Sequence, residues 1–276
     1  MFGKLSTILW VLIAINIHAQ NIHDLEHSKQ FADYLYKTGQ YDLAAEEYER
    51  IVFLEPDNLQ NKYLLISSYH KAREYKQALK RFNYFFENNL ASMPADFAEE
   101  YVKLLLLTRQ DSLAIDYLNQ NFSLNTELKN NLHLTALLLQ KKWDDSFRFA
   151  RSYPVTNEKM NAQLHLLAFE AKQIKYKSPA LAGFMSAIVP GTGKIYTKYW
   201  KDGIIAMVFV GVNAWQAYRG FERYGKKSAY GWIFAGLTAS FYLGNIYGSV
   251  KSAKKYNKKK DNEFYRKALY ISLGNL

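Results

Sequence analysis

An internal repeat with a period of 34 residues constrains the fold of this chain more than any other feature of its sequence. The matching positions are Tyr41, Ala44 and Tyr48 in the first copy and Tyr75, Ala78 and Phe82 in the second. A small residue lets two helices approach closely, and an aromatic residue one turn later fills the gap to the next helix. Because one such unit cannot bury its apolar face alone, stacked copies must share a core. The period predicts an all-α helical solenoid.

The first copy also carries Gly39, which can end a helix in the left-handed conformation, and Pro56 at its close. Together with the repeated positions, these residues resemble the tetratricopeptide repeat (TPR), a family of 34-residue helical pairs. The second copy departs from that motif, with Arg73 at the Gly position and Leu90 at the Pro position. Weaker helical periodicity continues over 96–107, 111–119, 132–139, 143–150 and 160–172. We therefore expect a TPR-like domain over 25–175, with about four helical pairs and a terminal helix.

The first helices of such a solenoid line a concave groove that binds a peptide or a helix of a partner protein. The candidate groove residues are Lys29, Asp33, Tyr36, Lys37, Tyr63, Ser67, His70 and Lys71. Family members that clamp a C-terminal carboxylate pair a Lys with an Asn four residues later, whereas here Lys29 is followed by Asp33. This difference argues against carboxylate capture. The alternative for each residue is an ordinary solvated helix face.

The N-terminus has the order of a secretory signal. Lys4 precedes an apolar stretch from Leu5 to Ile15, and a small residue, Ala19, follows. We expect a signal peptide over 1–19 that is cleaved after Ala19. An uncleaved anchor is the alternative, because residues 5–23 carry no charge and are nearly long enough to span a bilayer. Both interpretations predict an exported protein.

The net charge of +11 lies entirely in the last hundred residues. Residues 1–177 hold 21 Lys/Arg and 21 Asp/Glu, whereas residues 178–276 hold 15 and 4. Three uncharged runs interrupt this basic region, at 178–193, 203–218 and 228–250, and aromatic residues stand near their ends. Only the third comfortably reaches the ~20 residues needed to cross hydrocarbon. The pattern predicts a helical membrane domain over 178–250 with two to three membrane segments, the first of which either crosses or is re-entrant.

Glycines and aromatic residues recur in this region. The run Pro190-Gly191-Thr192-Gly193-Lys194-Ile195-Tyr196 resembles the motif of a small helical-hairpin membrane domain of bacterial envelope proteins. That family has no assigned function, is often fused to TPRs, and its likeness covers about residues 178–257. The resemblance implies a fold and a location rather than an activity. The motif positions are Pro190, Gly191, Gly193, Tyr196, Gly203, Gly236, Ser240, Gly244, Asn245 and Gly248.

Four of these positions form a small-residue stripe with four-residue spacing, Gly236, Ser240, Gly244 and Gly248. Such a stripe lets helix backbones touch in lipid. It predicts a packing face against the second uncharged run or, as the alternative, a homodimer through residues 236–248. Asn245 would then form a hydrogen bond across that interface.

Eight Lys/Arg fall within 251–276, which predicts a basic C-terminal tail. If all three runs cross, the positive-inside rule places the repeats in the periplasm and the tail in the cytoplasm, on anionic lipid headgroups of a bacterial inner membrane. RNA binding by the tail would need a sequence-reading module, and none is recognisable, so no nucleic-acid partner is predicted.

Residue chemistry gives no indication of an enzyme. The absence of cysteine excludes a thiolate nucleophile, disulfides and Cys-ligated metals. A phosphate-binding loop at Gly193-Lys194 fails because Ile188 and Ile195 occupy positions that need Gly and Ser/Thr. His23 and His27 are four residues apart but have no third metal ligand. No catalytic residue, cofactor or metal site is therefore predicted.

Taken together, the patterns predict a non-catalytic, membrane-anchored adaptor or assembly scaffold whose TPR-like groove binds a protein partner at the cell envelope. The alternative makes the membrane domain the active part, as a small insertion- or transport-assisting factor whose repeats recruit the client.

Overall fold

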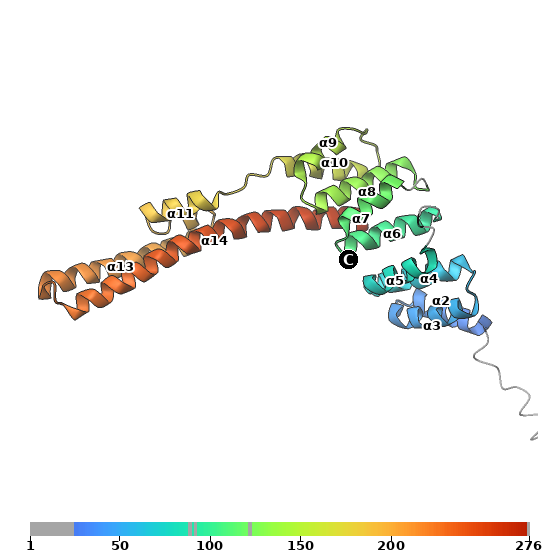
Figure 1. The fold of residues 1–276 in the computed structure, drawn as a ribbon, viewed down its shortest axis with the longest axis horizontal. Helices are drawn as coiled ribbons and strands as arrows, with labels where there is room; N and C mark the ends of the chain where they lie inside the picture. The colour runs from blue at the N-terminus through green and yellow to red at the C-terminus, as the bar shows by residue number, and fades with distance from the viewer. Residues whose placement is uncertain (1–24, 88–89, 91–92, 121–122, 275–276) are drawn as a thin grey trace, which may run out of the picture. The chain divides into compact units, whose positions relative to one another are not determined.

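The computed structural model describes residues 25–87, 90, 93–120 and 123–274, and this part of the chain contains 13 α-helices and no strand (Figure 1). The all-α prediction is confirmed. The predicted signal peptide over 1–19 lies outside the described residues. The chain divides into two compact units, with the boundary between Lys129 and Asn130, and each unit is described separately.

The first unit consists of helices in consecutive pairs. Their bounds are α2 (Leu25–Lys37), α3 (Tyr41–Leu54), α4 (Leu59–Lys71), α5 (Tyr75–Phe86), α6 (Ala95–Leu107) and α7 (Asp111–Gln120). The helices expected over 96–107 and 111–119 are found here, as α6 and α7, within one residue of their expected ends. This arrangement is compatible with a helical repeat solenoid.

One turn geometry joins the two helices of every pair. A residue with positive φ follows the first helix in each case, namely Gly39 (φ 81°), Arg73 (64°), Arg109 (64°) and Lys141 (60°). At Arg73 the backbone N–H donates to the His70 carbonyl at 2.9 Å, and the next N–H, of Glu74, donates to the Tyr69 carbonyl at 2.8 Å. These two bonds define a Schellman motif, which satisfies the last carbonyls of the helix. Arg73 therefore adopts the same backbone conformation as the glycine of the first copy.

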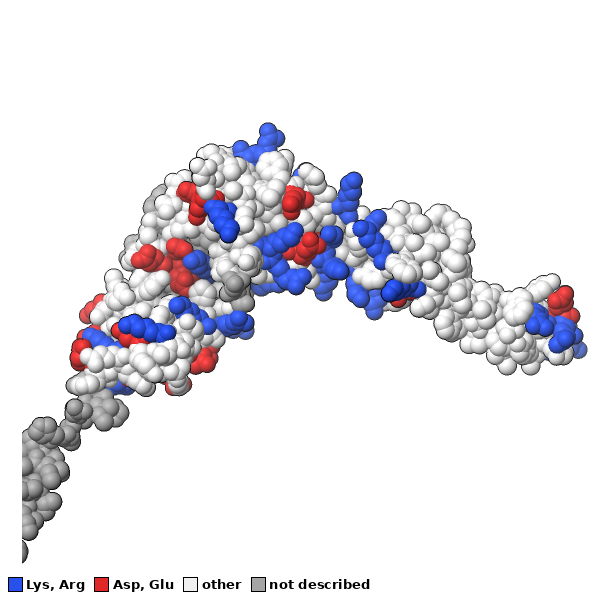
Figure 2. Space-filling model, turned by 180° about the vertical axis from the view of Figure 1, so that it is seen from behind, with Lys and Arg blue, Asp and Glu red and all other residues white. Residues whose placement is uncertain are grey.

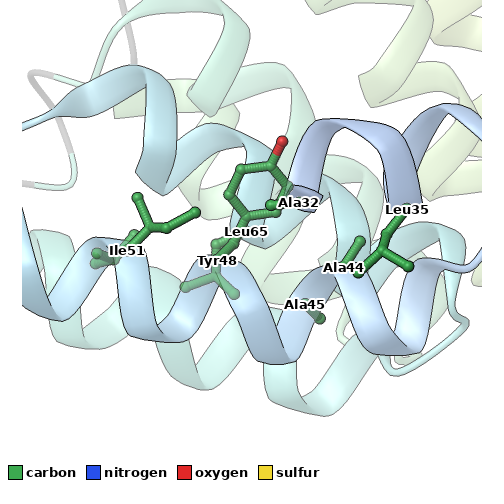
Figure 3. Packing of buried hydrophobic residues seen from close by; sticks show 8 residues of the cluster. Ala32, Leu35, Ala44, Ala45, Tyr48, Ile51 and Leu65 are labelled. Atoms are coloured by element: carbon green, nitrogen blue, oxygen red, sulfur yellow. The ribbon is translucent and has the colours of Figure 1, made fainter. Parts of the chain in front are cut away.

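The core of the first pair is built from the residues that define the repeat. Ala44 is fully buried between α2 and α3, and Tyr48 packs beside Ile51 against Leu65 of α4 (Figure 3). In the second copy Ala78 and Phe82 are both 0% exposed. The Phe82 ring lies 5.3 Å from that of Tyr101 on α6, between centroids, so it joins the second pair to the third. A small residue followed by a buried aromatic thus performs the same packing role in both copies.

The second unit contains a fourth helical pair, a terminal helix and a hairpin. Its helices are α8 (Thr126–Leu139, which begins just before the boundary), α9 (Trp143–Ala150), α10 (Lys159–Lys172), α11 (Pro179–Ile188), α12 (Thr192–Tyr196), α13 (Trp200–Tyr224) and α14 (Ala229–Leu273). Helix α13 and the first half of α14 form a long hairpin, with α11 and α12 packed on α14. Within the described residues no helix is both long and apolar enough to span a membrane. The two to three membrane-crossing segments expected from the uncharged runs are therefore not found.

The residues expected to form a separate basic tail instead continue α14, which is 45 residues long. Its second half packs on α10 and contacts α9, where the Trp143 and Phe264 rings lie 6.0 Å apart between centroids, and Phe264, Tyr265 and Ala268 are buried. The hydroxyl oxygens of Thr135 and Ser272 lie 2.5 Å apart. This apolar face stabilises the helical continuation of 251–273. In the sequence its residues are interspersed with lysines.

Candidate functional site

The predicted groove residues lie on α2 and α4, and several of them connect neighbouring first helices. The Tyr36 and Ser67 hydroxyls lie 2.8 Å apart and join α2 to α4. His70 pairs with Glu100 of α6 through Nδ1. The Tyr63 ring packs edge-on against Phe97, also on α6, at 5.4 Å between centroids.

Lys71 gives this face its exposed positive charge. Its ammonium lies 4.4 Å from the centre of the Tyr36 ring and 5.3 Å from that of Tyr41. The hydrogen bond with the Tyr36 hydroxyl raises the pKa of Lys71 above its usual value. The cation is thus held over two aromatic faces, a geometry worth about 0.5–1 kcal/mol at exposed sites.

The other predicted groove residues are engaged differently. Lys29 forms an ion pair with Glu55 at 2.8 Å. Asp33 accepts a 2.5 Å hydrogen bond from the Tyr48 hydroxyl, and burial together with this bond raises the Tyr48 pKa. Lys37 is exposed at the end of α2. The structure therefore brings Tyr36, Ser67, His70 and Lys71 together and leaves Lys29 and Asp33 in contacts within the first pair.

The sequence did not predict a recess in the first unit, a hollow of about 520 Å³ over α3, α4 and α5. Phe53 and Tyr84 line it and are 83% and 73% exposed. Arg81 and Glu49 form an ion pair at 2.5 Å in its wall. The only sequence signal for this recess is a pair of aromatic residues outside the repeat positions, on helices that a TPR-like solenoid assigns to its outer surface.

The hairpin carries an extensive exposed apolar surface. The large apolar side chains on it that are at least half exposed include Val208, Phe209, Val212 and Trp215 on α13 and Trp232, Ile233, Leu243 and Tyr247 on α14. We call these residues the apolar band. No charged residue occurs within 203–218 or 228–250, whereas Lys/Arg stand at both ends of the hairpin. Figure 2 shows the uncharged stretch between these charged ends on the visible face.

The motif glycines permit close backbone contacts. Gly191 (φ 91°) faces the backbone of Gly203, and a Cβ at either position would collide with the other residue. Gly193 lies against the Ala182 carbonyl, and its N–H donates to the Ser186 hydroxyl at 2.9 Å. Tyr196 accepts a hydrogen bond from the Ser178 N–H at 3.3 Å. The segment that starts at Pro190 is therefore a compact turn between α11 and α13.

The small-residue stripe on α14 departs from its expected role. A Cβ on Gly236 or Gly244 would meet no described residue within 4 Å, so these two glycines do not form a close helix contact in the part of the chain that the structure describes. Ser240 is exposed. A Cβ on Gly248 would lie 3.3 Å from Lys194 Cε rather than against a helix. The close contact between α13 and α14 occurs instead at Gly220, where a Cβ would lie 2.7 Å from the Gly231 Cα.

Among the described residues, no group of three or more His, Asp or Glu side chains is arranged to hold a metal ion. Comparison of the chain with protein-family models, with curated proteins and with solved structures yielded no match. The class that the structure itself defines is an all-α protein of consecutive helical pairs carrying a helical hairpin.

Proposed function

We propose that this protein is a membrane-associated adaptor. Its TPR-like helical pairs bind a segment of a partner protein, and its hairpin attaches the molecule to lipid at the bacterial cell envelope. The observation that carries the proposal is the apolar band, exposed along α13 and α14 and bounded by cationic residues at both ends.

Lipid is the partner that fits the apolar band. Large exposed apolar patches are rare on the surface of soluble monomers and indicate an interaction surface. Lys201 and Arg219 stand just outside the uncharged part of α13, where long basic side chains reach phosphate groups while their stems cover apolar surface. Trp215 and Trp232 have the amphipathic rings that favour the headgroup region. Burial of the band in the apolar layer would remove these side chains from water.

The ends of the hairpin constrain how the molecule meets the lipid. The Lys177 N–H donates to the Asn257 side chain at 2.8 Å, and the Asn257 amide donates back to the Lys177 carbonyl at 2.9 Å. The chain therefore enters and leaves the hairpin at one place, and α14 continues from there onto α8 and α10. In our proposal α8–α10 and residues 251–273 share one side of the lipid layer. This replaces the expectation that repeats and tail lie on opposite sides.

The partner-binding surface proposed is the face of Tyr36, His70 and Lys71, where the buried Ser67 is hydrogen-bonded to Tyr36. Its exposed cation and aromatic ring suit a peptide with acidic or aromatic side chains. Full-length protein immobilised in detergent should retain specific proteins from an envelope extract. Lys71→Glu should lose them, and Lys76→Glu, an exposed charge reversal on α5, should keep them. Equal retention by both variants would show that this face is not the binding site.

Flotation with phospholipid vesicles tests the lipid attachment. We compare full-length wild type with the double variant Val208→Asp/Val212→Asp, whose sites are 54% and 50% exposed. A carboxylate in the hydrocarbon costs about 3 kcal/mol on an insertion scale, so two should abolish flotation. Leu113→Asp, at a 53% exposed site on α7, is the matched control and should float as wild type does. Undiminished flotation of the double variant, with wild-type helicity, would refute attachment through the apolar band.

A further inference from the structure

A cavity of about 380 Å³ lies between α12, α13 and α14, beside the apolar band. One part of its wall is apolar and includes Ile205, Phe209 and Phe241, with the two phenylalanine rings 5.5 Å apart between centroids. The other part is polar and includes Lys194, Asp202 and Asn245. The cavity thus offers a polar end and an apolar end to one ligand.

Asn245 is the most informative residue of this wall. Its side chain is 4% exposed, and neither its amide nitrogen nor its oxygen has a hydrogen-bond partner in the described part of the chain. Asn213, the other buried asparagine of the hairpin, donates to the Phe209 carbonyl at 2.7 Å. Native proteins pair nearly all buried polar atoms. Asn245 therefore has a donor and an acceptor ready for a ligand in the cavity that it lines.

Two opposite charges line the polar end. Lys194 and Asp202 form no ion pair with each other or with another described residue. The stem of Lys194 lies over Gly248, where a larger residue would displace it. A simple anion would be attracted by Lys194 but repelled by Asp202. A ligand that carries one negative and one positive group satisfies both side chains.

We propose that this cavity binds one phospholipid whose zwitterionic headgroup carries a primary ammonium, the phosphatidylethanolamine class. The phosphate pairs with Lys194 and the ammonium with Asp202. The Asn245 amide donates to an ester carbonyl, and an acyl chain follows Phe209 and Phe241 onto the apolar band. The site rests on the lipid attachment proposed above, because the acyl chain needs that surface.

Native mass spectrometry of the full chain in detergent tests the site. Delipidated protein is titrated with dioleoyl phosphatidylethanolamine, with the phosphatidylcholine of the same chains, and with soluble O-phosphoethanolamine. The quaternary ammonium of phosphatidylcholine cannot donate a hydrogen bond to Asp202, so we expect at least tenfold tighter binding of the ethanolamine lipid. Asp202→Asn should abolish this preference, and Asn245→Leu should weaken ethanolamine-lipid binding about tenfold, which corresponds to about 1.4 kcal/mol. Asn213→Leu, the matched control, should retain both the affinity and the preference.

Each result decides one part of the proposal. Equal affinity for the two lipids while wild type still floats with vesicles would overturn the headgroup assignment and leave the lipid attachment standing. Loss of flotation by wild type would refute both. Unchanged binding by Asn245→Leu, with wild-type helicity, would show that the Asn245 amide does not bind the lipid. Binding of O-phosphoethanolamine as tight as that of the lipid would show that the ligand is a soluble phosphate ester.

Discussion

The packing of the end of α14 on α8 can be tested with an engineered disulfide. The hydroxyl oxygens of Thr135 and Ser272 are 2.5 Å apart, close to the 2.05 Å of a sulfur–sulfur bond, and both residues are buried. We therefore expect Thr135→Cys/Ser272→Cys to oxidise readily. Because the chain contains no native cysteine, any intramolecular disulfide must be the engineered one.

The size of the effect follows from the loop that the bridge closes. The two residues are 137 positions apart, and the chain-entropy relation gives about 5 kcal/mol for a loop of that length. Thr135 also donates to the Asn131 carbonyl at 2.8 Å, and loss of its hydrogen bonds costs about 1 kcal/mol each. We expect a net gain of about 3 kcal/mol, seen as a higher midpoint of thermal unfolding that reductant reverses.

A control pair distinguishes disulfide formation that results from this packing from disulfide formation by chance encounter of two thiols. Thr135→Cys/Tyr270→Cys places the second thiol two residues away, at a site that is 63% exposed, and about 200° around the helix. Gel mobility without reductant should show the bridge in the first variant only. Equal oxidation of both pairs, or of neither, would refute the docking of α14 on α8 and with it the one-sided arrangement of the proposed adaptor.

Three further predictions concern the turns, the hairpin and a buried histidine. Arg73→Gly should raise the free energy of unfolding by about 0.5–1 kcal/mol, because glycine relieves left-handed backbone strain of ~1–2 kcal/mol but loses more conformational entropy on folding. Urea unfolding measures the change, and a lower midpoint would contradict the repeated turn geometry. Gly220→Leu should destabilise by about 1–3 kcal/mol because its side chain meets the α14 backbone, whereas Gly236→Ala, facing open space, should be neutral or stabilising in thermal unfolding. His165 is 3% exposed, and burial lowers its pKa below the usual 6.5. The buried neutral imidazole therefore costs no folding stability above pH 6.5, but stability is lost as the pH falls below 6.5, because the unfolded chain then binds the proton more readily than the folded chain does. The stability of His165→Phe relative to wild type should therefore increase as the pH is lowered from 7 to 5. Parallel curves of unfolding free energy against pH would show that His165 does not cause the loss of stability.

The helical pairs were predictable because their signals are local. Apolar periodicity located α6, α7, α9 and α10 to within one residue at each end, and α8 begins at Thr126, six residues before the expected start. The turn at Arg73 could not be read from the residue type, since an arginine gives no indication of a positive φ. That geometry is imposed by the two helices that it joins.

The candidate sites were predicted less well, because they depend on contacts between distant segments. The small-residue stripe identified a plausible face of α14, but the glycine that approaches α13 is Gly231. Tyr36 and Ser67 were both expected to line the groove, but the hydrogen bond between their hydroxyls was not foreseen. The cavity at Asn245 needs three helices to form. A single sequence holds no signal for such a juxtaposition.

The basic residues after Val250 show why charge counting alone misleads. Their number predicts a free tail, yet Phe264, Tyr265 and Ala268 recur at helical spacing and are buried against α8–α10. The exposed lysines of 251–260 therefore lie on the segment of α14 that connects the exposed apolar band to the buried face. Lys194, Lys198 and Lys201 belong to the adjoining turn and to the start of α13. In the proposed orientation all of these lysines lie at the base of the hairpin, where lipid phosphates begin. The charge that suggested a tail resting on anionic lipid then surrounds the base of the hairpin, next to the helices that carry the apolar band.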